Sequence, residues 1–540
     1  MSARAAGVGL ALGFVAMVAL RLLLIHVSLS EILNWEEPYR LTIADAVIAG
    51  PRWSLADYQA DAYQGGSLAM GILAAPLVAV FGSSYETLKL VPLAFTLLTA
   101  AGWALLLWRW VSPAAAALAT WLFALAPPMA QIYQVHAMGS HAETALFTVA
   151  GFVLTMALLH PSATPVRVRV GTFALGAVAG LGLWYCYSAA SGIAAWGLVG
   201  LGMAPKGRVR RSFVPLLTGA AIGFTPWLVQ NLRSGFSGLE RVVELFGPRG
   251  SDLLPPVEPL VVRAAALVGV DLVRALGFAE TVPGVPEWPA WTLYLLGVVL
   301  VSLLAVLARG VSTVDRAEPL VARLIVLTIA VHLGAYLASS FRCDVENGFI
   351  AHRFFSPLFP LVAAGAAIVL TRPSRGWPQR AAGVGMVFVL GLGALGTAEL
   401  LRERPSRPIP LPTQSDALMG QAMLLKHRHD PARGLVLIAA LDEPQRTRVY
   451  FGFGWGLEFR YEKDGDWERL ARVLDGAQPD ERRAVLSGIR WAVRTREGQV
   501  RDYANAEFFG EYSRALHSRI VELAARLNAR DQPSASAFGG

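Results

Sequence analysis

Apolar runs near the length of a membrane span recur along the first 400 residues, and they limit what this chain can fold into. A helix needs ~20 apolar residues to cross a bilayer, and runs of about this length recur from Val8 to about Glu399. With 54% hydrophobic and 16% charged residues and a mean hydropathy of +0.48, the chain is too apolar for a soluble protein. The sequence therefore predicts an all-α fold with a polytopic transmembrane helical bundle over residues 1–400.

The remaining residues, 401–540, are charged and helix-like, so we expect a small soluble helical C-terminal domain. It begins with a Pro-rich connector over 404–412. Two segments inside it, Val449–Leu457 and Ala484–Val493, resemble one repeat about 35 residues apart, the spacing of a helix pair. Their Gly and Trp residues favour close packing between helices.

Basic clusters predict the topology, because short loops rich in Lys and Arg stay in the cytoplasm. Such clusters lie at 167–169, 206–211, 309–323 and 372–380. The first loop, 30–66, the long loop, 232–288, and the C-terminal domain then face outward, which is periplasmic in a bacterium. The apolar runs Ser67–Phe81 and Ala114–Ala126 are short for spans, and one of them must fail to cross fully to agree with this scheme.

Charge and cysteines exclude several classes of function. The net charge of +8 is concentrated in the loops that set topology, so it does not indicate nucleic-acid binding. The two cysteines, Cys186 and Cys343, are far apart, which excludes a disulfide framework. The first apolar run has no small-residue cleavage site after it, and we interpret it as an uncleaved span of an inner-membrane protein.

An acidic pair, Glu36-Glu37, directly follows the first span. It stands between Trp35 and Tyr39, which suit a lipid–water boundary. Acidic residues in the first turn of a helix are a structural alternative, because they complement the helix dipole. As catalytic candidates, two adjacent carboxylates beside an apolar bundle are placed to act as a general base.

A polar insert between apolar runs contains His136, His141 and Glu143. Histidines next to spans are costly unless they are used, so these residues are candidates for substrate binding. The alternative is a polar loop with interfacial histidines. A divalent cation bridging Glu36 with His141 and Glu143 is another hypothesis, although no metal-ligand spacing is present. No metal site is therefore assigned.

A third stretch, Phe341–Phe354, carries arginines on the predicted outer face. Arg342 and Arg353 suit the phosphate of an anionic lipid, and the alternative is an ion pair with Asp344 or Glu346. His352 belongs to the same candidate set of substrate-binding residues. Arg40 and Lys89 are lesser candidates for phosphate binding.

Four stretches of sequence resemble the GT-C glycosyltransferases of the family-39 type, which include protein O-mannosyltransferases and lipid A aminoarabinose transferases. They are PLVAVFGSSYETLKLVPLAFTLLTAAGWALLLWRW, WLFALAPPMAQIYQVHAMGSHAETALF, GAAIGFTPWLVQNLRSG and HRFFSPLFPLVAAGAA. The resemblance covers about Val8 to Leu400 and lies in the ordered series rather than in one motif.

This resemblance implies an inverting membrane enzyme that uses a polyprenyl-phosphate sugar at an outer-facing site. The family's base is usually the Asp of an Asp-Glu pair, and Glu36-Glu37 stands at that place. The family's His-Pro-Pro stretch is replaced by residues 63–66, and Glu143 falls where the family often carries a second acid. The expected partners are the lipid-linked donor and the membrane. The sequence names neither the acceptor nor the sugar. The rival functions are a transporter or flippase of lipid-linked glycans and a non-catalytic membrane scaffold.

Overall fold

The computed structural model describes the parts of the chain on which the following account rests. These are residues 2–30, 36–51, 54–59, 64–203, 206–233, 260–267, 317–339, 352–371, 431–443, 445–464 and 474–500, with shorter pieces around 235–243, 391–402, 419–423 and 521–525. Within these ranges every secondary-structure element is a helix and there is no strand. The predicted all-α class is confirmed.

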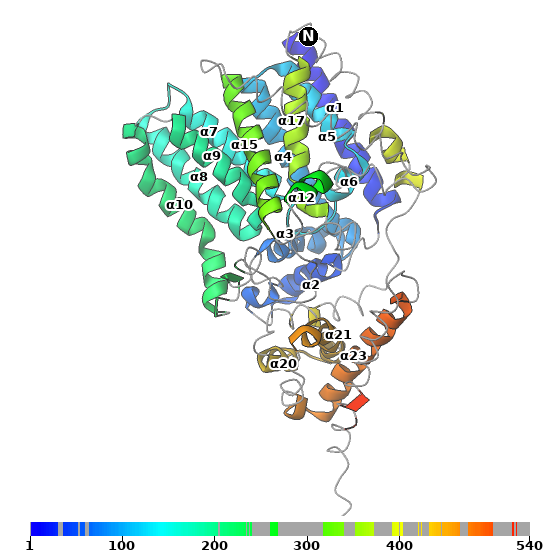
Figure 1. Cartoon of the computed structure of the whole chain (residues 1–540). Helices are drawn as coiled ribbons and strands as arrows, with labels where there is room; N and C mark the ends of the chain where they lie inside the picture. Colours follow the sequence, from blue (N-terminus) through cyan, green and yellow to red (C-terminus); the bar gives the residue numbers. More distant parts are fainter. Residues whose placement is uncertain are drawn as a thin grey trace, which may run out of the picture. The chain divides into compact units, whose positions relative to one another are not determined.

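The helices follow in chain order and are labelled as in Figure 1. They are α1 (Ala3–Val27), α2 (Glu36–Ala49), η1 (Leu55–Tyr58), α3 (Gly66–Phe81), α4 (Tyr85–Trp110), α5 (Pro113–Ala124), α6 (Pro128–Tyr133), α7 (Thr144–Leu159), α8 (Pro165–Tyr185), η2 (Tyr187–Ala189), α9 (Ala190–Met203), α10 (Lys206–Arg233), α12 (Leu260–Ala266), α15 (Ala317–Ala338), η5 (His352–Phe355), α17 (Leu358–Thr371), α20 (Pro431–Ala439), α21 (Gln445–Asp464) and α23 (Pro479–Val500).

The chain groups into two compact units. The first contains residues 1–33, 63–70 and 85–407, and the second contains 34–62, 71–84 and 408–540. The division that the sequence predicts, at residue 400, stays a prediction, because two N-terminal segments group with the C-terminal residues. Each unit is described by itself below.

Among the described residues, five helices are long and apolar enough to cross a membrane. They are Ala3–Val27, Tyr85–Trp110, Pro165–Tyr185, Ser212–Arg233 and Glu318–Ala338. The apolar helices α3, α5, α7 and α17 are shorter. The chain is thus a multi-pass membrane protein, as its apolar runs predict. The two short runs, of which one is expected to fall short of a full crossing, correspond to α3 and α5.

The first unit is a helical bundle whose core lies between α4, α5, α7 and α17 (Figure 1). Trp103 of α4 packs edge-on against Phe152 of α7, with ring centroids 5.6 Å apart. Phe123 of α5 packs in the same way on Phe359 of α17, at 5.8 Å. These aromatic contacts join helices that are far apart in the sequence and fix the walls of the site described below.

A cation lies at the centre of the contact between α1 and the α5–α6 segment. Arg21 is fully buried, and its Nε donates to Gln134 Oε1 at 2.7 Å while one Nη donates to Gln131 Oε1 at 2.9 Å. The other Nη donates to the carbonyls of Phe123 and Ala124 at 2.9 and 3.2 Å. Gln131 in turn donates to Thr397 Oγ1 at 2.6 Å. The network therefore ties α1, α5, α6 and the segment around Thr397 together.

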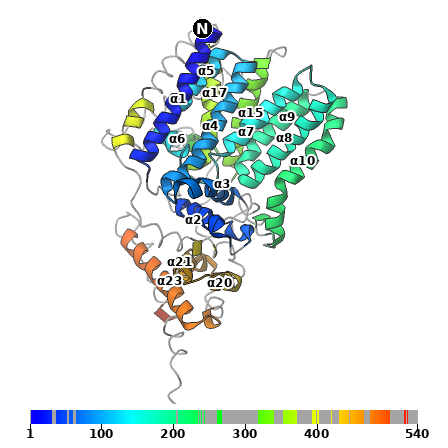
Figure 2. The same cartoon turned by 180° about the vertical axis from the view of Figure 1, so that it is seen from behind.

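Helices α8 and α10 lie side by side along their length (Figure 2). Each contributes two glycines four residues apart, Gly176 and Gly180 on α8 and Gly219 and Gly223 on α10. A Cβ at any of these positions would collide with a backbone carbonyl of the facing helix. The two backbones therefore pack with no side chain between them, as small-residue pairs allow in membrane helices.

In the second unit, the C-terminal repeat forms two packed helices, α21 and α23. A Cβ at Gly454 would collide with the carbonyl oxygen of Val485, and one at Gly488 with that of Phe451. The prediction that glycines of this repeat permit close helix packing is confirmed. Tyr450 adds a hydrogen bond from its hydroxyl to Glu481 Oε1 at 2.8 Å across the same contact.

The glycine contact between α8 and α10 leads to a stability prediction. We expect Gly180→Ala to destabilise the protein by about 1–3 kcal/mol, because the added methyl group overpacks a backbone contact. The matched control is Gly197→Ala on α9, where a Cβ meets open space. It should leave the stability unchanged or raise it slightly, since Ala favours a helix over Gly. Thermal unfolding of the purified variants in detergent measures both, and equal midpoints would contradict the packing argument.

Candidate functional site

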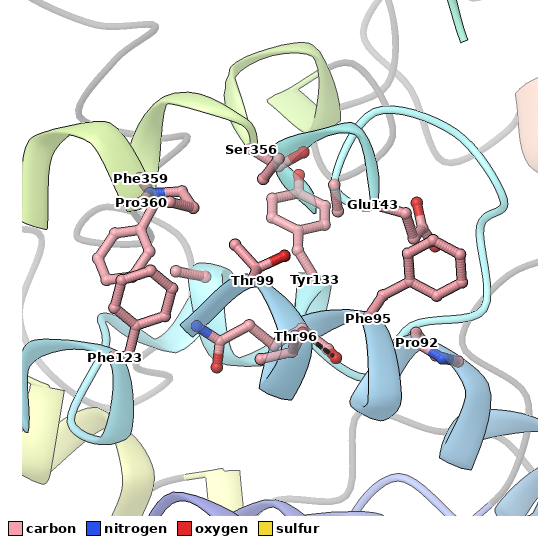
Figure 3. Close-up of a pocket in the computed structure, with 14 residues that line it drawn as sticks. Pro92, Phe95, Thr96, Thr99, Phe123, Tyr133, Glu143, Ser356, Phe359 and Pro360 are labelled. Carbon is pink, nitrogen blue, oxygen red and sulfur yellow. Dashed lines mark hydrogen bonds between the residues drawn. The ribbon is translucent and has the colours of Figure 1, made fainter. Parts of the chain in front are cut away.

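A pocket opens inside the first unit between α4, α6, α7 and the start of α17. Its cavity volume is about 30 Å³, which is room for one or two water molecules. Its polar lining residues are Thr96, Thr99, Tyr133, Gln134, Glu143 and Ser356, and its apolar lining includes Pro92, Phe95, Phe123, Phe359 and Pro360. In the view of Figure 3, Ser356, Tyr133 and Thr99 lie along the middle of the pocket and Glu143 lies at one end beside Phe95.

The loop between α6 and α7 forms one wall of this pocket and is held by Glu143. The Glu143 carboxylate accepts hydrogen bonds from the backbone N–H groups of Gly139 at 3.2 Å and Ser140 at 3.1 Å. Gly139 has a φ of +63°, a conformation that glycine adopts at little cost. A Cβ there would also lie within 2.8 Å of the Ser67 nitrogen, so both the turn and the close approach require glycine.

His141 lies behind Glu143 in a buried cluster of polar and aromatic groups. Its Nδ1 is 3.7 Å from Cys186 Sγ, and its ring packs edge-on against Tyr187 at 5.3 Å and Phe354 at 5.4 Å. Thr144 Oγ1 donates to the His141 carbonyl at 2.6 Å. The loop is therefore anchored to the segment between α8 and α9 and to η5.

Arg353 comes from η5 and is half-buried. The turn is fixed on both sides of it, because His332 Nε2 donates to the Phe354 carbonyl at 2.8 Å and Ser356 Oγ donates to the Arg353 carbonyl at 2.6 Å. The rings of His332 and Phe354 also pack at 4.7 Å. The turn that carries Arg353 is thus immobilised by contacts to α15.

The electrostatics show that Arg353, Glu143, His141 and Cys186 are neighbours. Burial lowers the pKa of His141 well below its ordinary value, and the positive charge of Arg353 lowers it further. Burial raises the pKa of Cys186 to about 12; hydrogen bonds from Ser188 and the charge of Arg353 oppose this rise, and the charge of Glu143 adds to it. At neutral pH, His141 and Cys186 are therefore uncharged.

Several predicted site residues are thus brought together and others lie elsewhere. His141, Glu143 and Arg353 meet in the first unit. His136 is fully buried in the same loop, and Lys89 is fully buried on α4 with its Nζ 5.5 Å from the centroid of the Tyr85 ring. Arg342 lies outside the described residues. His352 begins η5, and its side chain lies outside the described part.

The acidic pair lies in the first turn of α2, in the second unit. Glu36 and Glu37 are both buried. The Arg40 guanidinium donates to Glu36 Oε2 at 3.3 Å and to the Glu36 carbonyl at 3.1 Å. The two glutamates therefore stand at a helix start, as the structural alternative predicts, and Glu36 also forms an ion pair with Arg40. The catalytic role of Glu36 and Glu37 stays a prediction.

The structure adds residues that the sequence reasoning did not select. Gln134, Tyr133 and Ser356 line the pocket, and His332 and Cys186 support it. Their signal in the sequence is weak, because each is a common residue inside or beside an apolar run. Arg21 is different, since a charge in the middle of the first span is itself a signal. For the cation hypothesis, the described residues contain no group of three or more His, Cys, Asp or Glu side chains that could hold a metal ion.

The lowered pKa of His141 predicts a pH dependence of stability. Below the ordinary His pKa near 6.5, His141 binds a proton in the unfolded chain but not in the folded protein. The stability of the folded protein therefore falls as the pH falls. We expect His141→Gln to reduce the loss of thermal stability between about pH 7.5 and about pH 5. The control is His26→Gln on α1, which is largely exposed. The same acid-induced loss in His141→Gln and in the unmodified protein would contradict the prediction.

A comparison with solved structures finds similar helical membrane proteins at low sequence identity. ArnT from Cupriavidus metallidurans in the apo state matches with a TM-score of 0.46 and 16% identity, over 96% of this chain and 78% of that chain. The same protein bound to undecaprenyl phosphate matches with a TM-score of 0.46 and 16% identity, over 95% of this chain and 77% of that chain. A third match is the archaeal oligosaccharyltransferase AglB from Archaeoglobus fulgidus in complex with an inhibitory peptide and a dolichol-phosphate. Its TM-score is 0.41 at 12% identity, over 80% of this chain and 60% of that chain. No family model and no curated protein matches the chain.

Proposed function

We propose that this protein is a membrane glycosyltransferase that moves a sugar from a polyprenyl-phosphate donor to an acceptor on the periplasmic face. The observation that carries the proposal is the charged and polar cluster of Glu143, His141 and Arg353 beside a pocket in an apolar bundle. Charges buried in a membrane protein are costly and usually serve a substrate. A binding site for a lipid-linked sugar needs an apolar surface for the lipid and polar groups for the sugar phosphate.

Arg353 is the proposed ligand of the donor phosphate. A guanidinium binds phosphate oxygens through two parallel N–H groups, and η5 is fixed by His332 and Ser356. A phosphate here would leave as an anion when the sugar is transferred, and a preorganised cation stabilises that developing charge. Arg342, Lys89 and Arg40 stay lesser candidates for the same role.

The lining of the pocket carries groups that can bind sugar hydroxyls, and a sugar ring requires the pocket to widen from its volume of about 30 Å³. Hydroxyl groups of Thr99, Tyr133 and Ser356 line it, and the Glu143 carboxylate stands at its edge. Among the described residues no acceptor is found for the buried Gln134 Nε2, which is the proposed donor to a sugar hydroxyl. His141, His136 and His352 complete the proposed substrate-binding set.

Inverting transfer needs a base that deprotonates the acceptor. We assign this role to the pair Glu36-Glu37, on the strength of its position after the first span and the resemblance of the sequence. Which of the two acts as the base is left to experiment. The outer-face topology rests on the basic clusters and includes residues 401–540.

Two other classes are distinguishable from this proposal. A transporter or flippase of lipid-linked glycans would move the carrier without breaking the sugar–phosphate bond, and a scaffold would tolerate loss of the acidic pair. Mass spectrometry of envelope glycans and lipid-linked sugars in a deletion strain identifies the donor: accumulation of an unused lipid-linked sugar together with loss of one glycan modification supports the enzyme.

Removal of the proposed base gives the central prediction. Loss of a general base costs on the order of 10²–10⁴ in rate, so one of Glu36→Gln and Glu37→Gln should be nearly inactive and the other partly active. The measurement is donor turnover by the purified protein in nanodiscs, with the donor identified as above. Turnover like that of the unmodified protein in the double variant would rule out this mechanism.

Substitution of Arg353 should affect donor binding rather than folding. We expect Arg353→Ala to raise the KM for the donor strongly and Arg353→Lys to restore only part of it, because lysine lacks the planar fork. The control is Arg169→Ala on α8, an exposed arginine outside the pocket. An unchanged KM in Arg353→Ala, with unchanged thermal stability, would remove the arginine from the mechanism.

A further inference from the structure

A second hollow in the first unit has no part in the proposed reaction. It encloses roughly 470 Å³ between the end of α4, the end of α7 and the start of α8. Apolar side chains form most of its wall, namely Leu154, Ala157, Leu158, Val166 and Val170. Val166 and Val170 are 70% and 64% exposed, so this wall lies on the outer surface of the bundle.

The rim of this hollow carries positive charge. Arg109 and Arg167 both line it and both are exposed, and none of the described residues that line it is acidic. The Arg109 guanidinium lies 5.5 Å from the centroid of the Trp110 ring. Tryptophan and arginine together at a span end are typical of the lipid headgroup level.

Two further features lie at the hollow. His160 lines it, with its Nδ1 2.8 Å from Ser162 Oγ and 3.3 Å from the Ser162 backbone nitrogen. Helix α8 begins here with Pro165, and its N-terminal end carries a partial positive charge. Two arginines, a histidine and a helix start thus lie at one amphipathic hollow.

We propose that this hollow, defined by Arg109, His160, Arg167 and the apolar wall of α7 and α8, binds an anionic glycerophospholipid of the cytoplasmic leaflet. The headgroup phosphate lies between the arginines, and an acyl chain lies along Val166, Val170 and Leu158. Basic pockets between membrane helices on the cytoplasmic side bind anionic headgroups in this way. The cytoplasmic side follows from the positive-inside rule, which places the basic segment 167–169 there.

The test uses the full chain purified in detergent. We expect phosphatidylglycerol to raise the thermal unfolding midpoint and to remain bound in native mass spectrometry, while phosphatidylcholine at the same mole fraction does neither. In Arg109→Gln, Arg167→Gln the affinity for phosphatidylglycerol should fall roughly 25-fold, because each arginine contributes about a factor of five near anionic lipid. Unfolding without added lipid verifies that the double variant is folded.

The matched control is Arg169→Gln, which removes an exposed arginine of the same helix that does not line the hollow. It should retain the affinity for phosphatidylglycerol. Equal affinity in the unmodified protein and the double variant overturns the proposal. An equal loss of affinity in Arg169→Gln also overturns the proposal, since the effect would then come from the overall charge of the protein and not from this hollow. If inorganic phosphate alone stabilises the protein as much as phosphatidylglycerol does, the hollow binds free phosphate, and the proposal of a lipid site is overturned.

Discussion

The buried guanidinium of Arg21 is the interaction on which the site-bearing part of the bundle depends. A charged group in an apolar interior is costly unless its donors are satisfied, and here two glutamine side chains and two backbone carbonyls accept hydrogen bonds from the guanidinium. Both carbonyls belong to the end of α5, where the chain turns into α6 after Pro127. Their binding to Arg21 stabilises the irregular backbone that this break leaves without helical partners. A glycine or alanine at this place in α1 would leave that turn, and the two glutamines, unsatisfied.

The same network reaches the pocket through Gln134. Its Oε1 accepts from Arg21 and its backbone carbonyl accepts from Thr96 of α4 at 2.9 Å, so both the side chain and the backbone of Gln134 are held in place beside the pocket. Beyond Gln134 the chain is held by Glu143 and then by the cluster around His141. The 134–143 loop is therefore fixed at Gln134 and His141 by neighbours from other segments, and between them by the hydrogen bonds of Glu143 to Gly139 and Ser140. A rigid surround of this kind positions polar groups before a substrate arrives, which is the arrangement that transition-state stabilisation requires.

The helices and part of the site could be predicted from sequence, because they depend on local patterns. Apolar length predicts α1, α4 and α15, and a polar insert between such runs marks His141 and Glu143. The partners in the site could not be predicted, since Arg353 comes near His141 only through the packing of η5, which lies more than 200 residues along the chain from the insert. The Gly pairs of α8 and α10 cannot be recognised from the sequence either, because a glycine in an apolar run has no distinctive signal until the facing backbone is known. Residues such as Arg342 lie outside the described part and stay predictions.

The Cys186–His141 pair invites a different chemistry, and its surroundings argue against it. A thiol beside an imidazole can form a nucleophile and base, as in enzymes that use covalent intermediates. Such a pair needs a lowered thiol pKa and an imidazole able to take the proton. Here burial raises the pKa of Cys186 to about 12 and lowers that of His141 well below its ordinary value, so proton transfer from sulfur to nitrogen is strongly uphill. Both groups instead serve as uncharged packing and hydrogen-bonding partners within the cluster around His141. The thiol and the imidazole therefore carry no step of the proposed transfer.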